Sequence, residues 1–158
     1  MTVRGTITIW AMLAGVALGS LAPQAAWPDD PLRSVEYRQQ EIRKMASAMR
    51  VISRFLKDEG ASVADVGASA ETIHTIALEL VRGLFPEGTA IGVGRSGARP
   101  EIWQQWDLFK EQATNLAVAA GRLTAAAAGG DAEAVRGPIR AVGQACAACH
   151  ELFRQKVP

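Results

Sequence analysis

The sequence of 158 residues predicts one all-α domain, an up-down-up-down antiparallel four-helix bundle with left-handed packing. Its composition favours helix, because Ala, Leu, Glu, Gln and Arg are abundant and strand-forming residues are few. Four segments have apolar residues spaced alternately three and four apart, as expected for helices that each bury one stripe. Short connections between these segments favour antiparallel neighbours.

Residues 1–26 precede this domain and are expected to be a secretory signal peptide, which leaves residues 27–158 as the folded part. Arg4 is followed by an uncharged apolar run over residues 7–21 and then by small residues. An uncleaved membrane anchor is the alternative, because the run approaches the length needed to span a bilayer. The shortness of the run and Pro23 favour cleavage. We therefore expect a periplasmic domain, anchored to the membrane if the segment is retained.

The first expected helix begins at Asp30 and Pro31, which suit an N-cap and a first-turn proline, and it ends at Gly60. The second covers residues 63–84 and stops before Pro86. The two apolar stripes consist of Ile42, Met45, Met49, Ile52 and Leu56, and of Val63, Val66, Ala70, Ile73, Ala77, Leu80 and Leu84.

The third and fourth expected helices follow a glycine-rich loop over residues 86–100. The third opens at Pro100 and is closed by the glycines at 129–130. Asp131 suits the N-cap of the fourth, in which Pro138 is expected to kink the helix or loosen its first turns. The stripes consist of Ile102, Trp106, Phe109, Ala113, Leu116, Ala120 and Leu123, and of Val135, Ile139, Val142, Cys146, Cys149 and Phe153. The fourth stripe passes through both cysteines, so their chemistry is expected to face the bundle interior.

The charge balance argues against some classes of partner. The formal net charge is +1, with 49% hydrophobic and 21% charged residues. Without a basic or acidic bias, the composition does not indicate nucleic acid or a charged membrane surface as a partner.

Both cysteines and one of the two histidines fall in the segment Cys146-Ala147-Ala148-Cys149-His150. The spacing C-x-x-C-H is typical of covalent attachment of a c-type haem. Two thiols three residues apart on a helix project to one side, where each can add to a haem vinyl group and form a thioether. The imidazole of His150 can then reach the iron. We therefore expect one haem c per chain, linked through Cys146 and Cys149, with His150 as metal ligand.

Three other interpretations of the two cysteines are weaker. A thioredoxin-like redox pair expects a βαβ unit, which this sequence does not predict. A structural zinc site needs further ligands, and His74 is the only other histidine. A disulfide between Cys146 and Cys149 would close so small a loop that it would stabilise the fold little. We expect His74 to be a surface or boundary residue and not a ligand.

The chain resembles the cytochrome c-prime family, the class II c-type cytochromes, over residues 31–157. The resemblance rests on the position of the C-x-x-C-H motif near the C-terminus of a four-helix bundle, followed four residues later by Arg154. Two further segments are similar to the family's first helix and third-helix opening, namely Tyr37-Arg38-Gln39 with Ile42, and Arg99-Pro100-Glu101-Ile102-Trp103.

This resemblance implies roles for particular residues. His150 would be the axial iron ligand, and Arg38, together with Gln39, would pair with a haem propionate. An arginine suits this contact because its planar guanidinium matches a carboxylate. Arg154 would lie beside His150 on the proximal side of the haem, and Phe85 would line the haem pocket.

The distal side of the haem determines which ligands the iron accepts. Low-spin relatives have a methionine ligand where this chain has Ile42, and isoleucine cannot bind iron. The resemblance therefore implies five-coordinate iron with space for a small uncharged ligand, nitric oxide (NO) or carbon monoxide (CO). Met45 and Met49 lie on the same stripe and are expected to be flexible core residues. Arg82 stands where the family has a tryptophan, three residues before Phe85.

We therefore expect a one-electron carrier that binds NO or CO and is not an enzyme. Two alternatives stay open: a low-spin carrier with Met45 as sixth ligand, and a haem-based NO sensor or scavenger. A homodimer through the first two helices, which is common in the family, is compatible with the charges on those helices. The sequence does not identify the redox partner protein.

Overall fold

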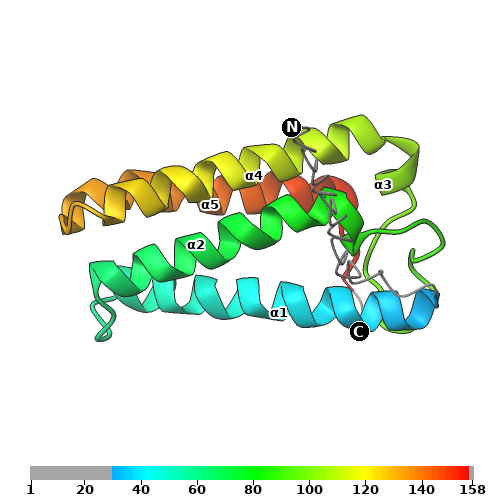
Figure 1. Ribbon diagram of the computed structural model, residues 1–158, viewed down its shortest axis with the longest axis horizontal. Helices are drawn as coiled ribbons and strands as arrows, with labels where there is room; N and C mark the ends of the chain where they lie inside the picture. The colour runs from blue at the N-terminus through cyan, green and yellow to red at the C-terminus, as the bar shows by residue number, and fades with distance from the viewer. Residues whose placement is uncertain (1–29, 157–158) are drawn as a thin grey trace, which may run out of the picture.

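The computed structural model describes residues 30–156, which form a bundle of α1 (Pro31–Leu56), α2 (Val63–Glu79), η1 (Leu80–Leu84), α3 (Glu101–Gln104), α4 (Trp106–Ala127) and α5 (Ala132–Phe153). The four long helices run in alternating directions, with α1 on α2, α2 on α4 and α4 on α5 (Figure 1). The predicted four-helix bundle is confirmed. None of the helices within residues 30–156 is both long and apolar enough to cross a membrane. The predicted signal peptide, residues 1–26, lies outside the described residues.

At one end of the bundle, which we call the turn end, the helices are joined by residues 57–62 and 128–131 (Figure 1). The helix starting there at Val63 is capped by Ser62 and Asp65, each of which bonds the backbone N–H of the other. The N–H of Glu133 donates to Asp131 at 2.9 Å in the same way. Residues 60 and 130 are glycines with φ of +79° and +73°, a backbone region that other residues rarely adopt. The predicted Asp131 cap and the stop before residues 129–130 are confirmed, whereas the first helix ends at Leu56, four residues before the predicted Gly60.

The other end, which we call the site end, consists of residues 84–105 together with the last turn of α5. Here the second helix ends as predicted at Leu84, through the widened π-helical turn η1. Side chains from other elements satisfy its terminal carbonyls. The guanidinium of Arg38 donates to Leu84 O at 3.3 Å, and the Trp103 indole donates to Phe85 O at 3.1 Å. The end of this helix therefore depends on contacts that are distant in sequence.

The expected third helix is divided in two, which corrects the sequence prediction. Gln105 has φ −125° and ψ 47°, so it ends α3 and begins α4. The reason is tertiary: the backbone N–H of Arg99 bonds Phe153 of α5, and Trp103 bonds the end of the second helix. These contacts hold α3 away from the axis of α4 (Figure 1).

The fourth helix, α5, continues through Pro138. Proline has no N–H, so the carbonyl of Ala134 lacks its helical partner, but Ala134 is exposed and water can satisfy it. The proline is thus accommodated on the solvent side without ending the helix.

Small buried residues allow α2 and α4 to pack closely. They are Ala70, Ala77, Ala113, Ala117 and Ala120, each at most 3% exposed. The two helices approach so closely near the turn end that a Cβ on Gly67 would lie 3.1 Å from the Cβ of Ala127. In contrast, α1 and α5 approach each other less closely than α1–α2, α2–α4 or α4–α5 do.

Candidate functional site

The two cysteines lie near the C-terminal end of α5, where their side chains are partly buried and pack against the hydrophobic core. The predicted stripe therefore does face the interior. Both thiols are free, so the structure contains no disulfide between Cys146 and Cys149. Free thiols on one face of a helix are what thioether formation requires.

The surroundings of the thiols argue against two of the other interpretations, the thioredoxin-like redox pair and the structural zinc site. Burial raises the pKa of Cys146, while burial and then the neighbouring Cys146 raise the pKa of Cys149 to about 11. Reactive dithiol pairs have a lowered thiol pKa instead, and zinc binds thiolates. Within residues 30–156, no three His, Cys, Asp or Glu side chains gather as a metal site would need.

His150 follows Cys149 in the last turn of α5 and is more exposed than the two cysteines. Burial of its surroundings, and secondarily the charge of Arg154, lower the pKa of His150 below its ordinary value. The imidazole is therefore neutral near pH 7, the form that binds a metal ion.

The first helix, α1, carries the apolar stripe formed by Ile42, Met45 and Met49. Ile42 is 38% exposed, whereas the two methionines are partly buried and pack against the core. Helical spacing places this stripe on the side of α1 that faces away from Ser47 and Val51, which border α2. An exposed isoleucine beside partly buried methionines is an apolar surface suited to a cofactor.

Arg38 lies on α1, and its side chain is buried against the loop between η1 and α3, with 3% of the residue exposed. Its Nη1 donates to Thr89 Oγ1 at 2.7 Å, and its Nη2 donates to Thr89 O at 2.8 Å and Ser96 Oγ at 2.9 Å. Burial lowers the pKa of Arg38 to about 10, so it stays charged at neutral pH. Within residues 30–156 no carboxylate pairs with it. Sequence reasoning missed Thr89 and Ser96, which lie in a loop without periodicity.

Phe85 lies beneath Arg38, with the guanidinium carbon 4.5 Å from the ring centre. Phe85 also belongs to an aromatic cluster around Phe109. The ring centre of Phe109 lies 4.9 Å from that of Phe85, 5.3 Å from that of Trp106 and 5.5 Å from that of Phe153. Phe85 therefore joins Arg38 to the apolar core, and it lies near the end of α5 that carries the cysteines.

Two further predicted site residues lie at the edges of this region. Gln39 donates from Nε2 to the carbonyl of Arg95 at 2.6 Å, which ties α1 to the loop. Arg154 is exposed at the end of α5, and its N–H donates to His150 O at 3.1 Å. Arg38, Gln39 and Phe85 thus form one group around the loop, while Arg154 lies with the cysteines and His150.

His74 lies away from this region, as predicted. It is partly buried on α2, and its Nδ1 lies 2.8 Å from the carbonyl of Ala117 on α4. A carbonyl only accepts, so Nδ1 carries the proton. His74 is therefore a boundary residue that joins two helices.

The residues of the site fit a c-type haem. Two free thiols and a neutral imidazole lie in consecutive turns of one helix, against an apolar core, and Ile42 offers an exposed apolar surface on α1. A thioether needs the thiols, iron needs the imidazole and a porphyrin needs apolar walls.

Comparison with known proteins leads to the same family. A family model described as Cytochrome C' matches residues 33–154. The cytochrome c' of Rhodospirillum rubrum is 34% identical over 146 residues, covering 92% of this chain and 95% of that protein. A cytochrome c' structure described as having ligand-controlled dimer dissociation has a TM-score of 0.71 and 31% identity, covering 80% of this chain and 98% of that one. A nitric oxide complex of a cytochrome c prime variant from Alcaligenes xylosoxidans also has a TM-score of 0.71 and 31% identity, covering 82% and 99%. The chain therefore belongs to the cytochrome c' family of c-type haem proteins.

Proposed function

We propose that this protein binds one haem c through thioethers from Cys146 and Cys149, with His150 as the axial ligand of the iron. The observation that carries this proposal is the placement of two free, partly buried thiols on the inward side of α5, followed directly by the imidazole of His150. The haem would supply an iron that accepts and releases one electron. The protein would transfer electrons and would not be an enzyme.

Arg38 is the residue that we propose to meet a haem propionate, with Gln39 beside it and Phe85 as a wall of the pocket. A buried cation without a carboxylate partner is costly, so an anionic group of the cofactor would stabilise it. Arg38 is held in place by Thr89 and Ser96, which orients its guanidinium before the cofactor binds.

We propose that the iron is five-coordinate and that Ile42 shields its sixth position. An isoleucine side chain has no atom that binds iron, and a small uncharged ligand such as NO or CO could displace it. A cytochrome c prime variant from Alcaligenes xylosoxidans forms a nitric oxide complex, which supports NO as a ligand for a relative. Met45 packs against the core, which favours a filling role over the alternative role of sixth ligand. A sensor or scavenger of NO would use the same iron position.

The attachment of haem is tested by mass spectrometry of the denatured protein. The wild type should carry one added haem mass, and Cys146→Ser or Cys149→Ser should weaken or abolish haem retention. Ala147→Ser, which adds a hydroxyl at an exposed position between the two cysteines, is the matched control and should keep the haem. A wild-type protein without added haem mass would overturn the proposal.

The coordination state is tested by absorption spectra of the ferrous protein with and without CO. We expect a high-spin spectrum that changes when CO is added, and tighter CO binding in Ile42→Ala because the shielding methyl groups are removed. A low-spin spectrum that persists in Ile42→Ala but becomes high-spin in Met45→Ala would identify Met45 as the ligand instead.

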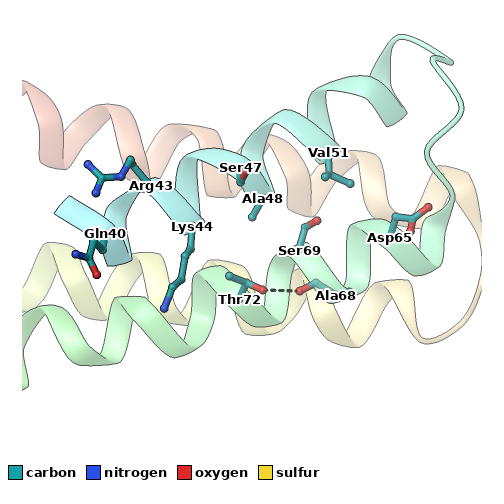
Figure 2. A pocket seen from close by; sticks show the side chains of 10 residues that line it. All are labelled: Gln40, Arg43, Lys44, Ser47, Ala48, Val51, Asp65, Ala68, Ser69 and Thr72. Carbon is teal, nitrogen blue, oxygen red and sulfur yellow. Dashed lines mark hydrogen bonds between the residues drawn. The ribbon is translucent and has the colours of Figure 1, made fainter. Parts of the chain in front are cut away.

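We further propose that α1 and α2 form the contact surface of a homodimer. A surface groove of about 680 Å³ runs between these helices, with Arg43 and Lys44 of α1 near one part and Asp65 of α2 near another (Figure 2). Two copies related by a two-fold axis would bring unlike charges together. The related cytochrome c' whose dimer dissociates under ligand control supports this. Sedimentation of Ala68→Glu, which places a charge in the groove, should show more monomer than Ala125→Glu on the exposed surface of α4.

Export to the periplasm is also part of the proposal, with residues 1–26 removed as a signal peptide. N-terminal sequencing of the mature protein should begin near residue 27. A mature protein that still begins at Met1 would support the anchored alternative.

A further inference from the structure

A short segment joins the two sides of the site end. This segment, Ser96–Arg99, lies between α1 and the last turn of α5 and is called the clip below. Its residues form hydrogen bonds to Arg38 on one side and to residues 151–155 on the other. The function proposed above gives the bonds between this segment and the end of α5 no role.

The backbone of the clip pairs with the end of α5. The N–H of Arg99 donates to Phe153 O at 3.0 Å, and the N–H of Gln155 donates to Gly97 O at 2.8 Å. Ala98 and Arg154 form an antiparallel bridge between these two bonds. Backbone hydrogen bonds therefore hold the chain on both sides of Arg154, the residue that follows the end of α5.

The side chain of Arg99 strengthens this connection. Its Nη1 donates to Leu152 O at 3.2 Å and to Glu151 O at 3.4 Å. The last carbonyls of a helix have no partner within the helix, and a cation there also opposes the helix dipole. Arg99 thus satisfies three consecutive carbonyls of α5, two through its side chain and one through its backbone.

The other side of the clip is fixed by Ser96. Its Oγ accepts from Arg38 Nη2 at 2.9 Å and from the Ala98 N–H at 3.2 Å, and it donates to Thr89 O at 2.7 Å. Hydrogen bonds therefore join buried Arg38 on α1 to Ser96 and Ser96 to Ala98, and the neighbours of Ala98, Gly97 and Arg99, bond the end of α5.

We propose that the clip positions the last turn of α5, and that Arg99 is its anchoring residue. Helix ends fray when their carbonyls are free; His150 belongs to this last turn, and Arg154 is the C-cap residue that follows it. If this turn frays, the imidazole of His150 and the side chain of Arg154 can adopt more than one orientation. Arg99 is thus a positioning residue that acts on the proposed iron ligand through the helix end. The part concerning iron rests on the proposed function, while the part concerning the helix end does not.

Hydrogen exchange of the purified full-length protein tests the helix end, whether or not haem is bound. In Arg99→Ala the amides of Arg154 and Gln155 should exchange about tenfold faster, the effect of losing about one charged hydrogen bond. Arg99→Lys keeps the charge and should restore part of the protection. Arg136→Ala is the matched control, since it removes an arginine at the other end of α5 and should leave these amides unchanged. Unchanged exchange in Arg99→Ala would overturn the proposal.

Electron paramagnetic resonance of the ferric protein tests the effect on the ligand. Arg99→Ala should broaden or split the wild-type signal, because the imidazole would adopt more than one orientation, whereas Arg136→Ala should keep the wild-type signal. Ser96→Ala removes the connection to Arg38 but leaves Arg99 intact, so it should produce a smaller change and serves if Arg99→Ala does not fold. A wild-type signal in both clip variants would refute positioning. Absence of covalent haem would instead refute the proposed function and leave the exchange result intact.

Discussion

The two ends of the bundle are built in different ways. At the turn end, helices begin and stop through residues that are close in sequence, such as the Ser62–Asp65 capping box and Gly130. At the site end, the defining bonds join residues far apart in sequence, such as Arg38 with Thr89 and Arg99 with Phe153. The core also changes, from small aliphatic side chains near Gly67 to the aromatic cluster around Phe109.

This difference separates an end that is defined by local sequence from an end that is defined by tertiary contacts. Local caps and glycine turns bring the helices together without help from a ligand, so the turn end needs only its own sequence. The site end places a buried cation, partly exposed apolar side chains and two free thiols in one region. A buried cation without a carboxylate partner is costly in an ordinary core, and a bound cofactor with an anionic group would compensate this cost. Substitutions at the two ends should therefore have different consequences.

The largest effect is expected from Phe109→Ala at the site end. Phe109 is 2% exposed and contacts the rings of Phe85, Trp106 and Phe153, so its removal leaves a cavity. We expect a loss of about 3–5 kcal/mol in the free energy of unfolding, measured by chemical denaturation. Val118→Ala, on the exposed face of the same helix, should cost less than about 0.5 kcal/mol. An equal loss of unfolding free energy in both variants would show that the aromatic cluster stabilises the fold no more than an exposed side chain does.

A smaller effect at the same end is expected from Arg38→Met. The change keeps much of the side-chain length but leaves Thr89, Ser96 and the Leu84 carbonyl without their donor. Buried polar groups without partners should reduce the free energy of unfolding by about 1–3 kcal/mol. Thermal denaturation followed by circular dichroism measures this loss. Arg43→Met, on the exposed side of α1, is the control, and a similar loss there would contradict the role of the loop bonds.

At the turn end, Gly130→Ala should destabilise the protein by about 1 kcal/mol. Gly130 has φ +73°, which costs any residue with a Cβ, although nothing lies close to where the Cβ would be. Denaturant unfolding should show this loss with an unchanged haem spectrum. Gly130→Asn should lose less, because asparagine tolerates this conformation. An altered haem spectrum in Gly130→Ala would show that the two ends are not independent.

The smallest effect concerns the pH dependence of the capping box. Hydrogen bonds from the side chain and backbone of Ser62 lower the pKa of Asp65. A carboxyl whose pKa is lower in the folded state stabilises the fold above its ordinary pKa, and this contribution is lost as the pH falls through the folded value. The difference in unfolding free energy between wild type and Asp65→Ala should therefore shrink in acid. A difference that stays constant down to strongly acidic pH would contradict this role.

Much of the fold could be predicted because its signals are local. The stops and starts at Gly60, Ser62 and Asp131 follow from residue types whose backbone and side-chain chemistry act within a few positions. The division of the third helix at Gln105 could not be predicted, because it depends on where Arg99 and Trp103 find partners in other helices.

The candidate site divides in the same way. The segment from Cys146 to His150 identifies c-type haem chemistry by itself, since thioether attachment needs two thiols and an imidazole at fixed spacing on one helix. No such spacing marks Thr89, Ser96 or Arg99, whose partners are brought near only when the chain folds. The tertiary structure alone decided that Arg38 is buried in the loop and that the clip fixes the end of α5, because a hydrogen bond between distant residues depends on helix packing and not on local sequence.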